Sequence, residues 1–442
     1  MPSATTPDSA VAAGQLLRRL GLFDATMLVM GGIVGSGIFM NPYVVARQVS
    51  EPWQILGAWI FGGAIALAGG FIYAELAARR PLLQGQYAYL FEAYHPALAF
   101  LYGWSLLLVT QTGGMAAVAV TFARYFLEVT GLLAPDWLIA VLALGALTLI
   151  NCLGVTAGSR AQALLMVLKI AAIAGIVACG LFLSGHAQPA VAAASAPFSF
   201  GAFGAAVTPV LFAYGGWQTS AVMAGELRNP KRDLARAMVL GVSGVVILYV
   251  AVNAVYLKAL GPAGLAATTT PASTILGQVF GERGAKLTAA IIAISTLGFL
   301  SQAMLTSPRV YFSMAADGLF FPQVARVSAK ARVPALAIVI QGVLAVIIAL
   351  SGRYEQILNY VIPVDFFFIG LTATCAFRFR ARDGKAGVDH AIPGHPYTTL
   401  FFVIASWTIV ANTIHRYPRE SGVGVLILLA GIPAYLYWRR RQ

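Results

Sequence analysis

The amino-acid sequence predicts an all-α, polytopic membrane protein with twelve transmembrane helices. Of its 442 residues, 59% are hydrophobic and only 10% are charged, whereas a soluble domain averages about 45–50% apolar and about 25% charged residues. Apolar runs of about 20 residues recur from one end of the chain to the other, and each is long enough to cross a hydrocarbon core of about 30 Å. The composition therefore excludes a soluble fold.

The first run is expected to be a membrane helix and not a signal peptide, because it lacks a short apolar region with a small-residue cleavage site. The connections between the later runs are too short to hold a soluble domain. The expected spans are residues 21–46, 53–77, 97–127, 137–156, 161–184, 201–224, 237–259, 286–314, 334–351, 357–378, 397–415 and 422–438.

The distribution of basic residues predicts the orientation of the chain. The net charge is +13, which alone could suggest a nucleic-acid partner. With the N-terminus inside, however, most Lys and Arg residues lie on the inner side, as the positive-inside rule requires. We therefore expect a multi-pass protein of the cell (inner) membrane, with the bilayer and no nucleic acid as its surroundings. Both termini are predicted to be cytoplasmic, and residues 1–17 to form a disordered cytoplasmic tail.

Metal, cofactor and enzyme chemistry are not favoured by the sequence. Cys152, Cys179 and Cys375 lie in or at the ends of apolar runs, and their spacing matches no metal motif. The "GVSG" around Ser243 is similar to a membrane serine protease motif, but such a serine needs a nearby base, and every histidine lies in a loop or near the end of a span. We expect no metal, no cofactor and no enzymatic activity.

Glycines interrupt the first span in "GGIVGSGIF", Gly31 to Phe39. Each glycine inside a helix costs roughly 1 kcal/mol relative to alanine; small residues four apart, such as Gly31 and Gly35, can also serve close helix packing. Five spans later, "FAYGGW", Phe212 to Trp217, repeats the interruption. Two such helices at corresponding places indicate an inverted-repeat transporter. The predicted units are 18–190 and 191–390, followed by two helices and the cytoplasmic C-terminus in 391–442.

A broken pair of membrane helices suits a zwitterionic amino acid. Unwound backbone at the bilayer midplane is tolerated only where it lines a polar cavity. The N-terminus of the second half-helix offers N–H donors and partial positive charge to a carboxylate. Carbonyls that end the preceding half-helix accept hydrogen bonds from an ammonium group. The interruptions are therefore predicted to form the binding site.

Three segments, "GGIVGSGIFMNP", "FAYGGWQTSAVMAGELRNPKRDLARA" and "LTSPRVYFSMAADGLFFP", resemble the amino acid–polyamine–organocation superfamily. The similarity is nearest to the L-type amino acid transporter branch and its bacterial relatives, and it covers roughly residues 18–415. It implies a LeuT-type fold, a five-plus-five inverted repeat with two additional helices. It also implies a secondary transporter of amino acids that works by alternating access.

The resemblance implies roles for individual residues of both interruptions. Backbone amides around Gly35, Ser36 and Gly37 would hold the substrate carboxylate, although Ser36 can also bond its own helix backbone. The carbonyls of Val34, Phe212 and Gly215 would receive the ammonium, and the Phe212 ring would close the pocket. Other implied positions are Ala213 and Tyr214 in the unwound stretch, Gln218 beside the substrate side chain, and Gly113 and Gly114 in the pocket wall; Tyr214 and Trp217 can equally be packing residues.

Lys169 is an ionisable residue expected deep in the bilayer. It lies about ten residues past the inner end of the fifth span, which places it ~15 Å deep, too far for easy snorkelling. The resemblance places a lysine at this point of the fifth helix, where sodium-coupled relatives hold a cation. We therefore expect Lys169 to replace Na⁺ by tying the first helix to the eighth, which predicts sodium independence. Proton symport and exchange both stay open.

Asp365 is the other ionisable residue in the middle of a span. A carboxylate facing lipid would be costly, so it is expected to line the interior. It can bind a cationic side chain, take part in proton transfer, or accept hydrogen bonds from broken backbone. The substrates are expected to be neutral L-amino acids, and the alternative is a cationic amino acid or amine exchanger in which Asp365 binds the substrate side chain.

Two further expectations concern partners. Animal L-type carriers pair with a helper chain through a cysteine in the second outer loop, but here that loop, "EVTGLLAPD", has none. A disulfide-linked heavy-chain partner is therefore not expected. A non-transporting amino-acid sensor is a further alternative, although such proteins usually carry a signalling domain. Charges such as Glu75, Arg79 and Arg80 at the cytoplasmic side are expected to be scaffold or gate ion pairs.

Overall fold

The computed structural model describes residues 21–80, 85–153, 159–182, 197–218, 227, 229–326, 328, 333–351, 354–384 and 391–441. The predicted tail at residues 1–17 lies outside these ranges. The helices, in chain order, are α1 Leu22–Ile33, α2 Gly37–Gln48, α3 Pro52–Arg79, α4 Gln86–Ala93, α5 Pro96–Ser105, the π-helix η1 Leu106–Thr110, α6 Gln111–Thr130, α7 Asp136–Cys152, α8 Ser159–Phe182, α9 Phe200–Tyr214, α10 Pro230–Ala267, α11 Pro271–Thr306, α12 Pro308–Ala316, the 3₁₀ helix η3 Pro322–Ala325, α13 Ala335–Ser351, α14 Tyr354–Asp383, α15 Tyr397–Arg416 and α16 Pro418–Arg439.

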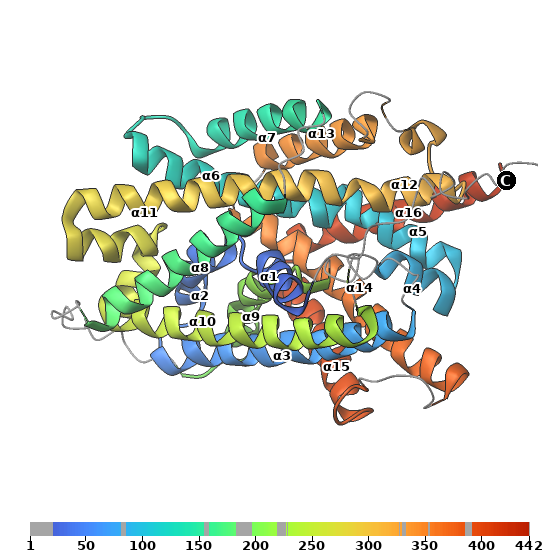
Figure 1. Cartoon of the computed structure of the whole chain (residues 1–442), viewed down its shortest axis with the longest axis horizontal. Helices are drawn as coiled ribbons and strands as arrows, with labels where there is room; N and C mark the ends of the chain where they lie inside the picture. The colour runs from blue at the N-terminus through green and yellow to red at the C-terminus, as the bar shows by residue number, and fades with distance from the viewer. Residues whose placement is uncertain are drawn as a thin grey trace, which may run out of the picture.

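The long helices run roughly along the long axis of the molecule, with the short α1 near the centre (Figure 1). Helices α3 and α10 lie side by side, as do α7 and α13, and α14 and α15. We call the right-hand end in Figure 1 the α4 end and the left-hand end, where α6 leads into α7, the α6–α7 end.

Seven helical segments among the described residues are long and apolar enough to cross a membrane, and the bent pair α1 and α2 makes an eighth. Four shorter apolar helices, at Asp136–Cys152, Lys169–Leu181, Phe200–Tyr214 and Ala335–Leu350, fall below the length required of a span. Large apolar side chains also point outward, with Leu149 69% and Ile247 72% exposed, as suits a surface facing lipid. The all-helical membrane architecture is confirmed, and the count of twelve spans stays a prediction.

Proline and glycine set several boundaries that the sequence prediction missed. The expected span 286–314 lies within one long candidate span, Pro271–Ala316, in which α11 ends at Thr306 and α12 begins at Pro308; proline at the first helical position lacks the N–H that would continue the preceding helix. The expected span 237–259 is the middle of the longer α10, which changes direction at Gly261, where φ is +66°. Hydrophobicity alone does not detect such bends.

Candidate functional site

The first interruption separates α1 from α2. Helix α1 ends at Ile33, α2 begins at Gly37, and the two axes differ by 42°. The Gly35 N–H donates to the Ile33 carbonyl at 2.8 Å, so the α-helical ladder ends here. The first N–H groups of α2 lie at a helix N-terminus, where they have no intrahelical acceptor. The buried Ser36 hydroxyl forms no hydrogen bond with the described residues, so it does not bond its own helix backbone.

The second expected interruption follows α9, and residues 219–224 of the expected span 201–224 lie outside the described residues. Ala213 and Tyr214 form the last turn of this helix, so the irregular stretch begins at Gly215, later than the sequence suggested. Gly216 has φ of +106°, a left-handed conformation that glycine adopts without steric cost. The Gly216 N–H donates to the Gln218 side-chain oxygen at 2.9 Å. Gln218 thus stabilises the turn through its amide oxygen.

The two interruptions contact each other through their backbones. A Cβ atom on Gly37 would lie 2.5 Å from the Ala213 Cα, and one on Gly216 would lie 2.0 Å from the Gly32 carbonyl oxygen. Neither position has room for a side chain, because the neighbouring atoms are backbone. Glycine at Gly37 therefore lets the start of α2 lie against the end of α9, and glycine at Gly216 lets the turn after α9 lie against the end of α1. The two irregular segments therefore lie next to each other.

Lys169 of α8 contacts the first interruption directly. Its side chain is buried, and Nζ donates to the Val34 carbonyl at 3.3 Å. The same Nζ lies 5.5 Å from the centroid of the Phe299 ring on α11, a distance at which a cation–π attraction operates. The Phe299 ring in turn lies 3.6 Å from where a Cβ on Gly35 would be. Lys169 and Phe299 together connect α8 and α11 to the broken backbone.

An aromatic cluster supports the interruptions from α3 and α10. The Tyr249 hydroxyl donates to the Ile33 carbonyl at 3.3 Å, which satisfies a carbonyl at the end of α1. Tyr214 packs against Tyr249 and Trp59, with ring centroids 5.2 and 5.8 Å apart. The Tyr214 ring is therefore part of this buried cluster. Trp59, Tyr249 and Phe299 were not predicted as site residues, since an aromatic residue within an apolar run carries no signal of its own in the sequence.

The other predicted pocket residues occupy different environments. Phe212 is only partly buried beside the interruption. A Cβ on Gly113 would lie 2.3 Å from the Val361 side chain, so Gly113 is a packing contact with α14. At Gly114 no atom lies within 4 Å of the added Cβ. Of the two glycines, Gly114 is the one with open space beside it.

Asp365 lies in the interior part of α14. Asp365 precedes the exposed Phe367 by two residues, so the two side chains are about 200° apart around the helix axis. Asp365 therefore lies on the opposite face of α14 from Phe367. Its carboxylate interacts electrostatically with the hydroxyls of Tyr73 on α3 and Tyr102 on α5. Within the described part of the chain it has no basic partner, and its side chain is partly accessible. Tyr73 packs edge-on against Trp217, with centroids 4.8 Å apart, and this contact links Asp365 to the second interruption.

A polar network closes the α6–α7 end of the bundle. Glu355 of α14 accepts hydrogen bonds from the Tyr43 hydroxyl at 2.9 Å and from Arg47 at 3.3 Å, both on α2. Arg124 of α6 donates to the Tyr43 hydroxyl at 2.9 Å and pairs with Asp136 of α7 at 3.1 Å. The network ties the C-terminal part of α2 to α6, α7 and α14.

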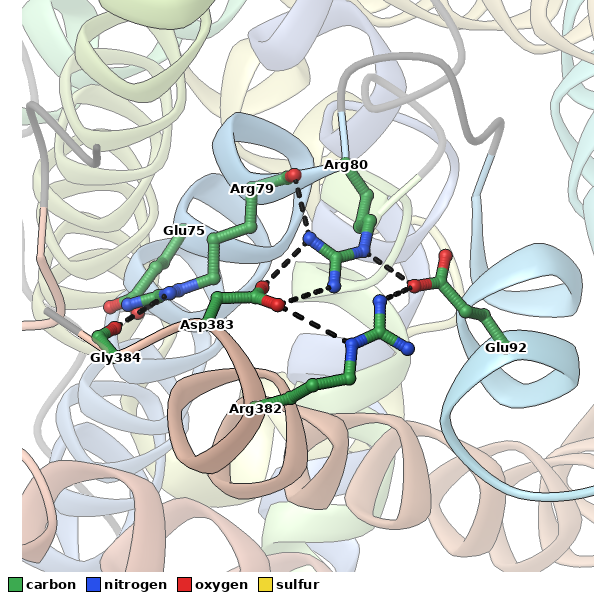
Figure 2. Close-up of polar contacts among 7 residues, drawn as sticks. All are labelled: Glu75, Arg79, Arg80, Glu92, Arg382, Asp383 and Gly384. Atoms are coloured by element: carbon green, nitrogen blue, oxygen red, sulfur yellow. Dashed lines mark hydrogen bonds and ion pairs between the residues drawn. The ribbon is translucent and has the colours of Figure 1, made fainter. Parts of the chain in front are cut away.

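A second network closes the α4 end, as Figure 2 shows. Glu75 of α3, fully buried, pairs with Arg79 at 2.7 Å and with Arg380 of α14 at 2.5 Å. Arg80 pairs with Glu92 of α4 at 2.7 Å and with Asp383 of α14 at 2.8 Å. These contacts join α3, α4 and α14, in agreement with ion pairs of a scaffold or gate.

Comparisons with known proteins agree in one assignment. The family model described as "Amino acid permease" matches residues 20–432. The serine/threonine exchanger SteT of Bacillus subtilis is 30% identical over 436 residues, which cover 97% of this chain and 98% of SteT. The b(0,+)-type amino acid transporter 1 of Mus musculus is 27% identical over 448 residues, covering 98% of this chain and 90% of that protein. The large neutral amino acids transporter small subunit 2 of Homo sapiens is 26% identical over 468 residues, covering 99% and 84%.

Proposed function

This chain belongs to the amino acid permease family, and we propose that it is a sodium-independent secondary transporter of neutral L-amino acids that works by alternating access. The observation that carries the proposal is the backbone contact between the α1–α2 break and the turn that follows α9, with Lys169 Nζ on the Val34 carbonyl. Amino acid transport is a property of the family. The sodium independence, the neutral substrates and the alternating-access mechanism of this chain are proposed.

The proposed site holds the substrate mainly with backbone groups. The carboxylate binds at the N-terminus of α2, where the N–H groups of Ser36 and Gly37 lack intrahelical acceptors. The ammonium binds at the carbonyls of Val34, Phe212 and Gly215. Phe212 closes the pocket, and Gly114 leaves room for the substrate side chain. Such a site recognises the part that all α-amino acids share, so the side-chain pocket sets the preference among them.

Lys169 is proposed to do the work of a bound cation. Its ammonium places a fixed positive charge on the broken backbone and joins α8 and α11 to it. A sodium ion at this place would be redundant.

The proposed topology is a LeuT-type arrangement of two inverted five-helix units, 18–190 and 191–390, with two further helices. The positive-inside distribution supports cytoplasmic termini, so the α4 end is the proposed cytoplasmic end. SteT comes from a bacterium, which supports the cell membrane as the location. We also propose that the chain needs no disulfide-linked partner; a covalent complex on a non-reducing gel would contradict this.

A neutral substrate is supported by the names of the relatives, a serine/threonine exchanger and a large neutral amino acid transporter. Asp365 supports a second candidate, exchange of cationic amino acids or amines, because its carboxylate has no basic partner among the described residues. A substrate ammonium or guanidinium would supply the missing charge.

The experiment is uptake of a panel of radiolabelled amino acids into proteoliposomes. Each is measured with and without Na⁺, with and without a pH gradient, and with and without internal amino acid. Neutral amino acids should enter without Na⁺, and dependence on internal amino acid would establish exchange. Uptake restricted to arginine, lysine or amines would favour the second candidate. A folded protein that binds amino acids and transports none of them would instead be a sensor.

A further inference from the structure

Arg378 of α14 ends a row of exposed and partly exposed side chains on one helix face, which we call the lipid-facing row. Phe367 is 37% exposed, and Leu371, Thr374 and Arg378 follow it at intervals of four, three and four residues, which is the spacing of one helix face. Helix α14 has 30 residues and is therefore about 45 Å long, longer than a hydrocarbon core of about 30 Å. Its last turns, including Arg378, reach the headgroup level at the α4 end.

The guanidinium of Arg378 is held in one orientation. One nitrogen, Nη1, donates to the Ala93 carbonyl at the end of α4, at 2.9 Å. The guanidinium carbon lies 4.4 Å from the centroid of the Tyr94 ring, and the Tyr94 hydroxyl is hydrogen-bonded to Thr374 at 2.6 Å. Arginine carries five N–H donors, so this arrangement fixes the side chain while leaving donors free.

The neighbouring charges do not neutralise Arg378. Glu92 and Asp383 are shared between Arg80 and Arg382, as Figure 2 shows, and Glu75 is shared between Arg79 and Arg380. In the ranges that the structure describes, Arg378 is hydrogen-bonded to a carbonyl but has no carboxylate partner. A fixed, exposed guanidinium at the membrane surface is thus left with uncompensated positive charge.

A hollow of about 400 Å³ opens beside this guanidinium, between α4 and α14. It is lined by Glu92, Ala93, Arg378, Phe379, Ala381 and Arg382. The Glu92 carboxylate in its wall is already paired with two arginines, so the free charge that an anion meets there is positive. Basic pockets between helices at the cytoplasmic side of a membrane are suited to phospholipid headgroups.

We propose that this hollow binds the phosphate of an anionic phospholipid, with the free donors of Arg378 on its oxygens. A planar guanidinium can donate two parallel hydrogen bonds to a phosphate. The acyl chains would lie along Phe367 and Leu371, on the same face of α14. This continuity with the lipid-facing row favours a lipid over free phosphate. The site is independent of the transport activity proposed above.

The test measures retention of phosphatidylglycerol by the purified protein in detergent. Native mass spectrometry and thermal unfolding are followed against added phosphatidylglycerol, phosphatidylcholine and glycerol phosphate, for wild type, Arg378→Gln and Arg419→Gln. Arg419 is the matched control, an exposed arginine near the start of α16 at the other end of the bundle. Wild type and Arg419→Gln should bind phosphatidylglycerol preferentially, and Arg378→Gln about tenfold more weakly.

Equal phosphatidylglycerol binding by wild type and Arg378→Gln would overturn the site. So would equal stabilisation by phosphatidylcholine, or full competition by glycerol phosphate, which would indicate a free-phosphate site. If Arg378→Gln does not fold, a photoactivatable phosphatidylglycerol is used with the wild type alone. Cross-links in peptides containing Tyr94 and Arg378 support the proposal, and their absence there contradicts it.

Discussion

Substitution of Gly216 by alanine is expected to abolish transport by forcing the two helix interruptions apart. The added Cβ would lie 2.0 Å from the Gly32 carbonyl oxygen, whereas ordinary contacts begin at 3.4 Å. The backbones must therefore separate by about 1.4 Å, the difference between these two distances. Alanine must also adopt φ of +106°, which costs about 1–3 kcal/mol, and overpacking adds about 1–3 kcal/mol.

The assay compares thermal unfolding in detergent with amino acid uptake in proteoliposomes. Gly216→Ala should lose about 2–6 kcal/mol of stability by the sum of these two effects, and its uptake should fall at least about tenfold. Gly145→Ala in α7 is the matched control, because nothing lies within 4 Å of its added Cβ. There, alanine should be neutral or stabilising by up to about 1 kcal/mol. Wild-type uptake by Gly216→Ala would refute the proposed contact between the interruptions.

Three further predictions address other parts of the structure. Glu355→Gln weakens the network at the α6–α7 end and should make the site more accessible from that end. A Ser36→Cys reporter should therefore react about two- to fivefold faster with an impermeant thiol reagent. The control, Glu282→Gln, breaks an exposed pair with Lys286 and should leave the reaction rate unchanged. Asp365→Asn should retain neutral amino acid uptake within about twofold if the substrate is neutral, whereas loss of arginine or lysine uptake alone would support the cationic candidate. Burial and the Arg380 charge lower the pKa of His395 from 6.5. As the pH drops below 6.5, the unfolded chain is protonated at His395 more readily than the folded chain, so stability should fall. His395→Gln should reduce this fall in melting temperature, and an unchanged pH profile would contradict the assignment.

The places of both interruptions could be predicted from the sequence because glycine is costly inside a helix. Several glycines in the middle of a span therefore indicate a local departure from helix. It did not predict that Gly37 lies against Ala213 or Gly216 against Gly32, because contacts between distant segments have no local pattern. For the same reason, the end of α9 at Tyr214 and the use of Gln218 within its turn became visible only in three dimensions.

Charged residues in apolar runs were informative for a similar reason. The depth of Lys169 follows from its distance along the helix, and its burial and contact with Val34 agree with a residue of the interior. Its aromatic neighbour Phe299 was missed, since one phenylalanine among many carries no mark. Arg378 lies near the end of an apolar run, where a basic residue is common. It stands out only in three dimensions, because the neighbouring carboxylates are already paired with other arginines.

The central claim is that broken backbone and Lys169, not a sodium ion, hold the amino acid. The most direct measurement is calorimetric binding of a transported neutral amino acid in sodium-free buffer, for wild type, Lys169→Met and Lys258→Met. Lys258 is the control because it also donates to a backbone carbonyl, that of Leu181, but is exposed. Wild type and Lys258→Met should bind equally, and Lys169→Met about 10- to 100-fold more weakly, as expected for a lost charged hydrogen bond. Unchanged binding by Lys169→Met, or wild-type binding that requires Na⁺, would contradict the account.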